Sequence, residues 1–510
     1  MIEFLFIITS SLLVFSRSLY SLYRLQSYDY YAVFKAKPIL FNILISILLG
    51  AVALTMEYLS VVGYIGFSTL SIVFSALILG GYFSKRTHFK FTARALRVTL
   101  PYWLIIIALN ITFSLVLNGI YRIIALVSVV LLSEIILFVV SGCISPFERK
   151  RNFNYAYRLT KRVRNKNLIK IVITGSYGKT TCKNILTALL SEKYRVIATE
   201  RNYNTPLGIA KTVSNLSPAG FSEGEKPIVF IAEAGARRMG DVRKICELVT
   251  PTYGIVTGVC AMHLDTFRSV ERIKRAKQEL ADYIGENGTV IFNGDNEHTL
   301  EMSKEFKGKS VVVGLKNGDI NIFNLKTTVL GSSFDLRYGD KVISLKTSLL
   351  GRHNALNVAL TVALALELGI DIESIVKAVG NLKATEHRLQ VIVSGGITIL
   401  DDSYNGNLVG VKEALNLIAS YGGRKVIYAQ GIVECGRQKG KINQEIGRAI
   451  GKVAEVVMLS GENSKHLLKG LKEAGFKGEI FKFSTIMHAK DSFKNILKQG
   501  DIFYIQNDIP

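Results

Sequence analysis

Five long apolar runs fill the first 150 residues, and they constrain what this chain can fold into more than any other feature. Most of them approach the roughly 20 apolar residues that a helix needs to cross the hydrocarbon core of a bilayer. The first run has no basic stretch before it and no convincing cleavage site, so we expect a retained helix rather than a signal peptide. The runs are residues 2–15, 39–56, 59–83, 98–117 and 123–141.

The charge of the chain is distributed around these runs. Residues 1–170 carry 19 Lys and Arg but only 5 Asp and Glu, and the basic residues gather after the first, third and fifth runs. Because basic loops stay on the cytoplasmic side, this pattern predicts a multi-pass protein of the cell membrane with an outside N-terminus and with everything after residue 150 in the cytoplasm. Nucleic-acid binding is another reading of a basic chain. Membrane loops account better for the excess here, so we expect membrane lipids and no nucleic acid as partners.

From residue 165 onward, short β-branched runs alternate with helical stretches rich in Ala, Leu and Lys. This alternation is typical of a parallel α/β sheet built from strand–helix–strand units. The five cysteines are scattered and form no Cys-x-x-Cys pair, so we expect neither a disulfide framework nor a structural zinc site. The predicted strands are residues 169–174, 228–232, 254–259, 290–293, 397–400, 426–429, 456–459 and 503–506.

One motif in this part of the chain points to specific chemistry. The segment T-G-S-Y-G-K-T-T, residues 174–181, follows the first predicted strand and opens a predicted helix. Backbone N–H groups in such a loop cradle phosphates at a helix N-terminus. Lys179 would neutralise the β- and γ-phosphates of ATP, and the Thr180 hydroxyl would hold Mg²⁺. The common P-loop has a glycine where this chain has Ile173, so the loop is a shorter form.

This loop resembles that of the Mur ligase family, the ATP-dependent amino-acid and peptide ligases of cell-wall synthesis. Seven further segments are similar to motifs of the family and follow in its order. E-A-G-A at residues 233–236 and D-D-S-Y-N at residues 401–405 look most like the branch that adds D-alanyl-D-alanine. The segments are residues 202–208, 233–236, 263–267, 276–279, 293–296, 351–357 and 401–407.

The resemblance implies a chain of three domains. Residues 1–150 would form a membrane region of helices, and residues 151–385 an α/β central domain that binds ATP through the phosphate loop. Residues 386–510 would form a Rossmann-like C-terminal domain, which closes over ATP and excludes water from a reactive acyl phosphate. The membrane region stands where the family normally has a domain that grips a UDP-sugar.

The family's chemistry then implies roles for particular residues. A carboxylate reacts with ATP to give an acyl phosphate, and an amine attacks it, so catalysis depends on cations and positioning. The implied catalytic residues are Lys179, Lys277 and His263, and Lys277 would carry a carbamyl group. Two Mg²⁺ ions are implied, held by the oxygens of Thr180 and Glu233 and by His263.

The same motifs imply the positions that bind ATP and substrate. Asn293 and Asn357 would contact the base, Arg388 would reach ATP from the domain junction, and Asp402 would hold the ribose. The implied ATP-binding residues are Gly175, Ser176, Gly178, Lys179, Thr180, Thr181, Asn293, Asn357, Arg388 and Asp402. The implied substrate residues are Asn202, Asn204, Ser403, Tyr404 and Asn405.

The sequence leaves the substrates open. We expect a ligase of peptidoglycan precursor synthesis that joins D-Ala-D-Ala or a similar amine to a muropeptide carboxylate. The muropeptide could be linked to UDP or to a lipid, and cell-wall synthesis proteins in the membrane could be partners. Poly-γ-glutamate synthases combine an N-terminal anchor with a Mur-like core and are an alternative. An ATP-driven transporter is a different class, but residues 180–510 show no signature of a transport ATPase.

Overall fold

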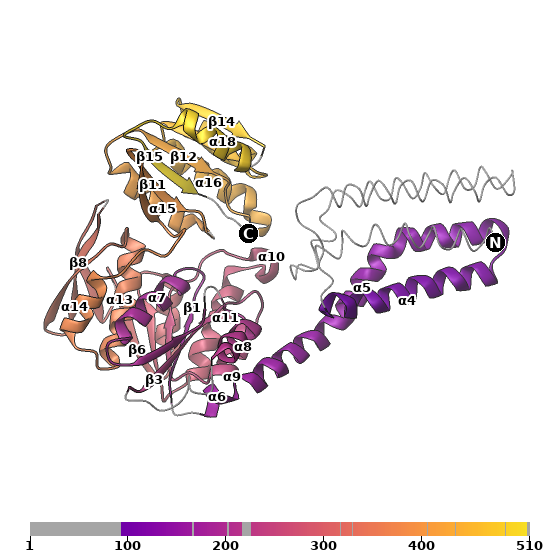
Figure 1. The fold of residues 1–510 in the computed structure, drawn as a ribbon, viewed down its shortest axis with the longest axis horizontal. Helices are drawn as coiled ribbons and strands as arrows, with labels where there is room; N and C mark the ends of the chain where they lie inside the picture. Colours follow the sequence, from indigo (N-terminus) through magenta and orange to yellow (C-terminus); the bar gives the residue numbers. More distant parts are fainter. Residues whose placement is uncertain are drawn as a thin grey trace. The chain divides into compact units, whose positions relative to one another are not determined.

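The computed structural model describes residues 93–165, 168–200, 203–216, 226–316, 318–328, 330–404, 406–433, 435–484 and 486–506. Its contacts divide the chain into two units, Met1–Asn152 and Phe153–Pro510, which are described separately (Figure 1). Three of the five predicted membrane spans, residues 2–15, 39–56 and 59–83, lie outside the described residues.

In the first unit, the described chain is helical. Helix α4 spans Ala93–Val116, and α5, which continues into the second unit, spans Gly119–Leu159. Among the described helices, one is long and apolar enough to cross a membrane, over Leu96–Val116 of α4, and only 28% of this apolar stretch is buried. A helix from the core of a soluble protein would bury most of its surface. The predicted span 98–117 therefore corresponds to α4, and the predicted span 123–141 falls within α5.

The second unit contains two β-sheets, and the larger one has the strand order β2-β3-β1-β4-β5-β6-β7-β8-β9. Its strands from β2 to β7 pair in parallel, whereas β7, β8 and β9 pair antiparallel. The prediction of a parallel sheet is therefore wrong at this edge. Buried and exposed residues alternate along these last strands, which is the pattern of an antiparallel sheet with one solvated face. The strands are β1 (Ile169–Thr174), β2 (Arg195–Ala198), β3 (Ile228–Ala234), β4 (Tyr253–Val256), β5 (Thr289–Asn293), β6 (Lys309–Gly314), β7 (Ile320–Thr328), β8 (Gly331–Tyr338) and β9 (Lys341–Thr347).

Helices cover both faces of this sheet. On one face, α7, α13 and α14 share a hydrophobic cluster with the strands, and on the other face α8, α9, α11 and α12 share a second cluster. Residues 354–365 of α13 are all buried, which fits a helix whose sequence is apolar on nearly every side. The helices are α6 (Lys161–Asn165), α7 (Lys179–Leu190), α8 (Pro206–Asn215), α9 (Asp241–Val249), α10 (Leu264–Phe267), α11 (Val270–Ile284), α12 (Glu297–Glu305), α13 (Arg352–Glu367) and α14 (Ile372–Gly380).

The smaller sheet has the strand order β10-β11-β15-β12-β13-β14. Only β10 pairs antiparallel, so this sheet is also mixed. Helices α15, α16 and α17 pack on one face and α18 on the other. The elements are β10 (Gln390–Ser394), β11 (Ile397–Asp402), α15 (Leu408–Ala419), β12 (Lys425–Ala429), η2 (Gly436–Gln438), α16 (Lys439–Gly451), β13 (Val456–Ser460), α17 (Ser464–Glu473), β14 (Glu479–Phe483), α18 (Ile486–Ile496) and β15 (Ile502–Gln506).

The strand order places a crevice at one edge of the larger sheet. Strand β1 lies between β3 and β4, so the chain order reverses there. Open α/β sheets bind ligands beyond the carboxyl ends of the strands at such a switch point. The segments that follow β1, β3 and β4 are therefore the first place to look for a site.

Candidate active site

The phosphate loop follows β1, and two of its glycines are required by their surroundings. Gly175 has a φ of 146°, and a Cβ there would lie 2.0 Å from Thr257 Oγ1. Gly178 has a φ of 76°, and a Cβ there would lie 2.7 Å from Asn357 Oδ1. Both values lie where side chains are disfavoured, so any other residue would displace the loop.

Hydrogen bonds fix this loop to the segment that follows β4. The Ser176 N–H donates to the Gly258 carbonyl oxygen at 2.8 Å, and the Cys260 N–H donates to Ser176 Oγ at 3.2 Å. The Thr257 hydroxyl donates to the carbonyl oxygen of Tyr177. The loop is therefore held in one conformation before any ligand arrives.

Lys179 lies across this loop. Its Nζ donates to the Gly175 carbonyl oxygen at 2.6 Å. Burial lowers the pKa of Lys179, and the nearby Glu233 carboxylate opposes that effect. A cation thus lies over a loop whose helix begins with free N–H groups, which is the arrangement that binds phosphate.

Glu233, near the end of β3, is completely buried between two residues of α7. Its Oε1 lies 2.9 Å from Lys183 Nζ, and its Oε2 accepts a hydrogen bond of 3.1 Å from Thr180 Oγ1. Lys183 is 3% exposed, and its Nζ also donates to the Thr199 carbonyl oxygen at 2.7 Å. The lysine compensates the buried carboxylate and fixes which of its oxygens faces the phosphate loop.

The donor set beside the loop fits one Mg²⁺ ion. Thr180 and Glu233 offer hard oxygens 3.1 Å apart next to the place where phosphates would bind, and Mg²⁺ prefers such ligands together with phosphate and water. In the part of the chain that the structure describes, no group of three or more His, Cys, Asp and Glu side chains is placed to hold a metal. The role of His263, which precedes α10, therefore stays a prediction.

Lys277 of α11 is 3% exposed. Burial lowers the pKa of its amine to about 7, and the positive charge of Lys179 contributes. Its side-chain amine forms no hydrogen bond or ion pair with any described residue. A buried amine that is about half neutral near pH 7 can act as a nucleophile, which a solvated lysine cannot do to the same extent.

The two asparagines predicted to contact the base are buried near the loop. Asn293, at the end of β5, donates to the Thr257 carbonyl oxygen at 2.8 Å. The Oδ1 of Asn357, on α13, lies beside Gly178 and 3.4 Å from Cys182 Sγ. Both side chains thus pack against the phosphate loop or the segment bonded to it. Their contact with the adenine base of ATP stays a prediction.

Arg388, in the segment that leads to β10, reaches the phosphate loop. Its Nη2 donates to Thr180 Oγ1 at 3.3 Å, and its guanidinium stacks 4.6 Å from the Tyr404 ring centroid. Burial raises the pKa of the nearby Asp402 carboxyl to about 6, which a hydrogen bond of 3.1 Å from Tyr504 and the charge of Arg388 oppose. The predicted Arg388, Tyr404 and Asp402 therefore lie close to one another.

Ser403 and Thr181, which were also predicted to lie in the site, make other contacts. Ser403 Oγ lies 3.2 Å from His387 Nδ1, which also bonds Asp401 Oδ2 at 2.7 Å. Thr181 lines a different cavity, of about 290 Å³, together with Leu382.

Of the predicted substrate residues, Asn204 lies beside Gly235, and two others lie outside the residues that the structure describes. The Asn204 carbonyl oxygen accepts a hydrogen bond of 2.9 Å from the Gly235 N–H, next to the end of β3. Asn202 and Asn405 lie outside the described residues.

Two further residues had no predicted role. Lys183 escaped because a lysine in a helix normally indicates a solvated face. His353 sits in the predicted segment 351–357, and burial lowers its pKa to about 4. Its Nδ1 has no hydrogen-bond partner among the described residues. His353 belongs to a segment that the sequence matched to the family, but no role was predicted for it, and Lys183 carries no pattern that would have distinguished it.

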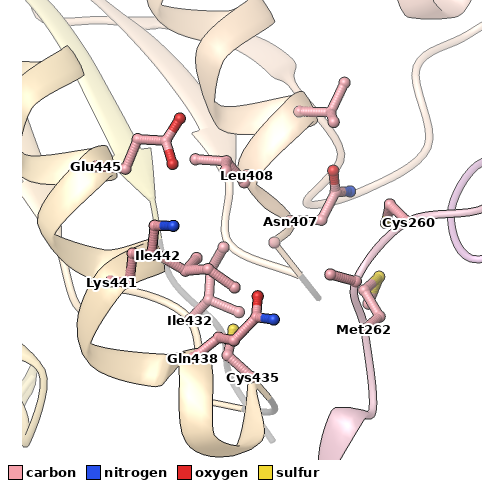
Figure 2. A pocket seen from close by; sticks show the side chains of 13 residues that line it. Cys260, Met262, Asn407, Leu408, Ile432, Cys435, Gln438, Lys441, Ile442 and Glu445 are labelled. Carbon is pink, nitrogen blue, oxygen red and sulfur yellow. The ribbon is translucent and has the colours of Figure 1, made fainter. Parts of the chain in front are cut away.

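A pocket of about 510 Å³ adjoins the loop (Figure 2). On one side it is lined by Cys260, whose backbone bonds Ser176, and by Met262. The other side comes from the segments after β11 and β12 and from α16. These lining residues are Gly406, Asn407, Leu408, Val409, Ile432, Cys435, Gln438, Lys441, Ile442 and Glu445.

Comparison with known proteins supports this fold. Residues 173–365 match the Mur ligase middle domain, and residues 387–506 match the Mur ligase glutamate ligase domain. The UDP-N-acetylmuramoyl-tripeptide–D-alanyl-D-alanine ligase of Escherichia coli is 29% identical over 283 residues, covering 55% of this chain and 61% of that protein. The enzyme of that name from Bacillus subtilis is 27% identical over 356 residues, covering 64% of this chain and 76% of that protein.

A solved structure shows the same architecture. The crystal structure of MurF from Acinetobacter baumannii superposes with a TM-score of 0.62 at 23% identity, covering 71% of this chain and 77% of that chain. The match to the Escherichia coli protein spans less than two thirds of its length, so the likeness concerns two domains rather than a whole protein. Through these middle and C-terminal domains, the chain belongs to the Mur ligase family.

Proposed function

We propose that this chain is an ATP-dependent amide ligase of peptidoglycan precursor synthesis. One observation carries the proposal: the Thr180 hydroxyl meets a buried carboxylate from β3 and a guanidinium from the segment before β10. A phosphate loop alone would fit many ATP-using proteins. The added Arg388 brings a second cation to the transferred phosphoryl group, where charge stabilisation does most of the catalysis.

The reaction has two steps. The carboxylate oxygen of the acyl substrate attacks the γ-phosphorus of ATP, and ADP leaves. The amine then attacks the carbonyl carbon of the acyl phosphate, inorganic phosphate leaves with the former carboxylate oxygen, and the ammonium loses its proton. Lys179 and the loop N–H groups hold the phosphates, and Arg388 neutralises the transferred group. Mg²⁺ held by Thr180 and Glu233 would screen the phosphate charge.

Lys277 fits the role that the family resemblance suggests. Its lowered pKa, about 7, leaves a neutral amine that can add to CO₂ and form a carbamate. A carbamate would place a negative charge beside the positive charge of Lys179. We propose that this group, with His263, serves a second Mg²⁺ ion.

We further propose that the ligase works at the membrane. The apolar helix Leu96–Val116 supports at least one membrane span, and the apolar runs before residue 93 extend this proposal to a multi-pass region over residues 1–150. Residues 151–385 and 386–510 would then be the cytoplasmic catalytic domains. Such an anchor favours contact with membrane partners and makes a lipid-linked muropeptide a natural alternative to a UDP-linked one.

The proposal is tested with detergent-solubilised full-length protein, Mg²⁺, ATP and bicarbonate. We expect phosphate release that requires both D-Ala-D-Ala and a UDP-linked or lipid-linked muropeptide, with a new amide detected by mass spectrometry. Lys179→Ala should lower the rate at least ~100-fold, whereas Lys304→Ala, on the exposed side of α12, should not. Turnover with glutamate polymers instead would indicate a poly-γ-glutamate synthase. ATP binding without turnover on any acyl substrate would contradict the ligase.

A further inference from the structure

We propose that His387 is a positioning residue, whose hydrogen bond to Asp401 keeps the side chain of Arg388 directed at the phosphate loop. This inference rests on the proposed function, because Arg388 is the second cation of the proposed reaction. It adds to that function two residues, His387 and Asp401, for which the sequence motifs predicted no role.

Arg388 lies in the segment that joins the two domains. Ala384 still packs against the hydrophobic cluster of the larger sheet, whereas Leu389 belongs to the cluster of the smaller sheet. The chain therefore passes from one core to the other over residues 385–388. These residues belong to neither cluster. Contacts other than core packing must therefore set the direction of the Arg388 side chain.

The backbone has an uncommon conformation on both sides of Arg388. His387 has a φ of 61° and Leu389 a φ of 49°, which is the left-handed region that residues with a side chain rarely adopt. Such a conformation persists only where surrounding contacts hold it. Leu389 is buried in the core of the smaller sheet. The His387 side chain is 56% exposed, so packing does not hold its backbone.

Hydrogen bonds to the end of β11 hold His387 instead. Its Nδ1 lies 2.7 Å from Asp401 Oδ2, and because a carboxylate only accepts hydrogen bonds, Nδ1 carries the proton and donates it. Asp401 is buried, and its Oδ1 accepts a hydrogen bond of 3.1 Å from the Ser403 N–H. Ser403 Oγ lies 3.2 Å from the same imidazole nitrogen. A carboxylate that is itself fixed in the smaller domain thus fixes the imidazole.

With the backbone held on both sides, the Arg388 side chain extends back to the larger domain. Its Nη2 donates to Thr180 Oγ1 at 3.3 Å, and its guanidinium lies 4.6 Å from the Tyr404 ring centroid. The Arg388 N–H donates to the Thr385 carbonyl oxygen at 3.1 Å, which closes a turn. A cation stabilises phosphoryl transfer most when it is already oriented as the charge develops. Without its hydrogen bond, His387 would relax out of the left-handed region and turn the guanidinium away from the phosphates.

The test measures nucleotide affinity, which needs no turnover. ADP lacks the γ-phosphate that Arg388 would neutralise, so the ratio of the Kd for ADP to the Kd for ATP reports the position of the guanidinium. Isothermal titration calorimetry of the full-length protein with Mg²⁺ gives both constants. Because both come from one preparation, their ratio does not depend on the fraction of protein that is folded.

We expect His387→Ala and Asp401→Ala to lower this ratio ~5-fold and to lower the kcat of phosphate release at least ~10-fold. His387→Asn should restore most of the ratio. Asparagine tolerates the left-handed conformation, and its amide nitrogen can donate to Asp401 from the place of Nδ1.

A double-mutant cycle shows whether His387 acts through Arg388. Arg388→Gln alone should lower the ratio at least as much as His387→Ala, and the double variant should lower it no further. The matched control is His488→Ala. This exposed histidine of α18 also has its Nδ1 beside a serine hydroxyl, 2.8 Å from Ser484 Oγ, and its removal should change none of these values.

Equal weakening of ATP and ADP binding by His387→Ala would indicate a merely structural role and overturn the inference. An unchanged ratio would overturn it too, as would a double variant whose loss is the product of the two single losses. If the ratio depends on His387 but no acyl substrate supports turnover, the ligase fails and the positioning role stands. Turnover with a ratio that does not depend on His387 leaves the ligase and removes the positioning role.

Discussion

The phosphate loop and the pocket beside it are built on opposite principles. Around the loop, the charged groups of α7 and β3 satisfy one another: Glu233 is paired with Lys183 and accepts a hydrogen bond from Thr180. In the pocket, Lys441 has no partner among the described residues. A site that handles the same nucleotide in every turnover gains from a fixed arrangement. An unpaired cation on a pocket wall, by contrast, leaves a charge that a bound anionic group can complete.

Removing the ion pair between Lys183 and Glu233 should have the largest effect on the stability of the protein. Lys183→Met leaves the carboxylate of Glu233 buried without its cation, which should cost about 3–5 kcal/mol. Adding Glu233→Gln should recover part of the loss, because the double variant buries no charge. Thermal unfolding of the full-length protein with and without Mg²⁺-ATP measures both effects. If the two substitutions are additive, or if Lys183→Met costs no more than Lys304→Met, the pair does not stabilise the site.

Near the phosphate loop, Lys277 is a buried charged residue without a described partner for its amine. The effect of this lysine on stability should therefore depend on pH. The folded protein protonates this amine only below about pH 7, whereas the unfolded chain does so up to about its ordinary value of 10.5. Folding with this lysine is therefore penalised most below pH 7, and the penalty declines as the pH rises toward 10.5.

Lys277→Met should accordingly raise the thermal midpoint by a few degrees below pH 7, in CO₂-free buffer, and by less at higher pH. Wild type with ¹³C-bicarbonate should show a carbamate carbon signal that Lys277→Met lacks. A gain that is the same at every pH would show that the amine keeps an ordinary pKa in the folded protein.

Asp402, at the end of β11, should give the smallest effect. Burial raises the pKa of its carboxyl to about 6, so the carboxylate is lost as the pH falls below that value. If the carboxylate holds the ribose, the affinity for ATP should fall severalfold between pH 7 and pH 5. Asp402→Asn should bind ATP more weakly at pH 7 and show little change with pH. Titration with a fluorescent nucleotide measures these affinities. If the variant keeps the pH dependence of wild type, Asp402 does not hold the ribose.

The sequence predicted the parts of the site that lie on β1, on the phosphate loop and at the end of the neighbouring strand β3. Strand β1 has the predicted bounds, and Thr180 and Glu233 meet because β1 and β3 are neighbours whose carboxyl ends share an edge. The antiparallel strands β7 to β9 were not predicted, because buried and exposed residues alternate along them instead of forming the continuous apolar runs of the parallel strands. Lys183 could not be predicted, since only the fold shows that this helical position faces Glu233. The pocket depends on segments far apart in the chain, around residues 260, 406 and 441.

The most direct test of the central claim follows one oxygen atom. The acyl substrate is labelled with ¹⁸O in the carboxylate that is joined to the amine, and the released phosphate is analysed by mass spectrometry. An acyl-phosphate ligase transfers one ¹⁸O from that carboxylate to each inorganic phosphate, and the amide keeps the other. Phosphate without ¹⁸O would mean that water, not the carboxylate, attacks ATP, and would contradict the account.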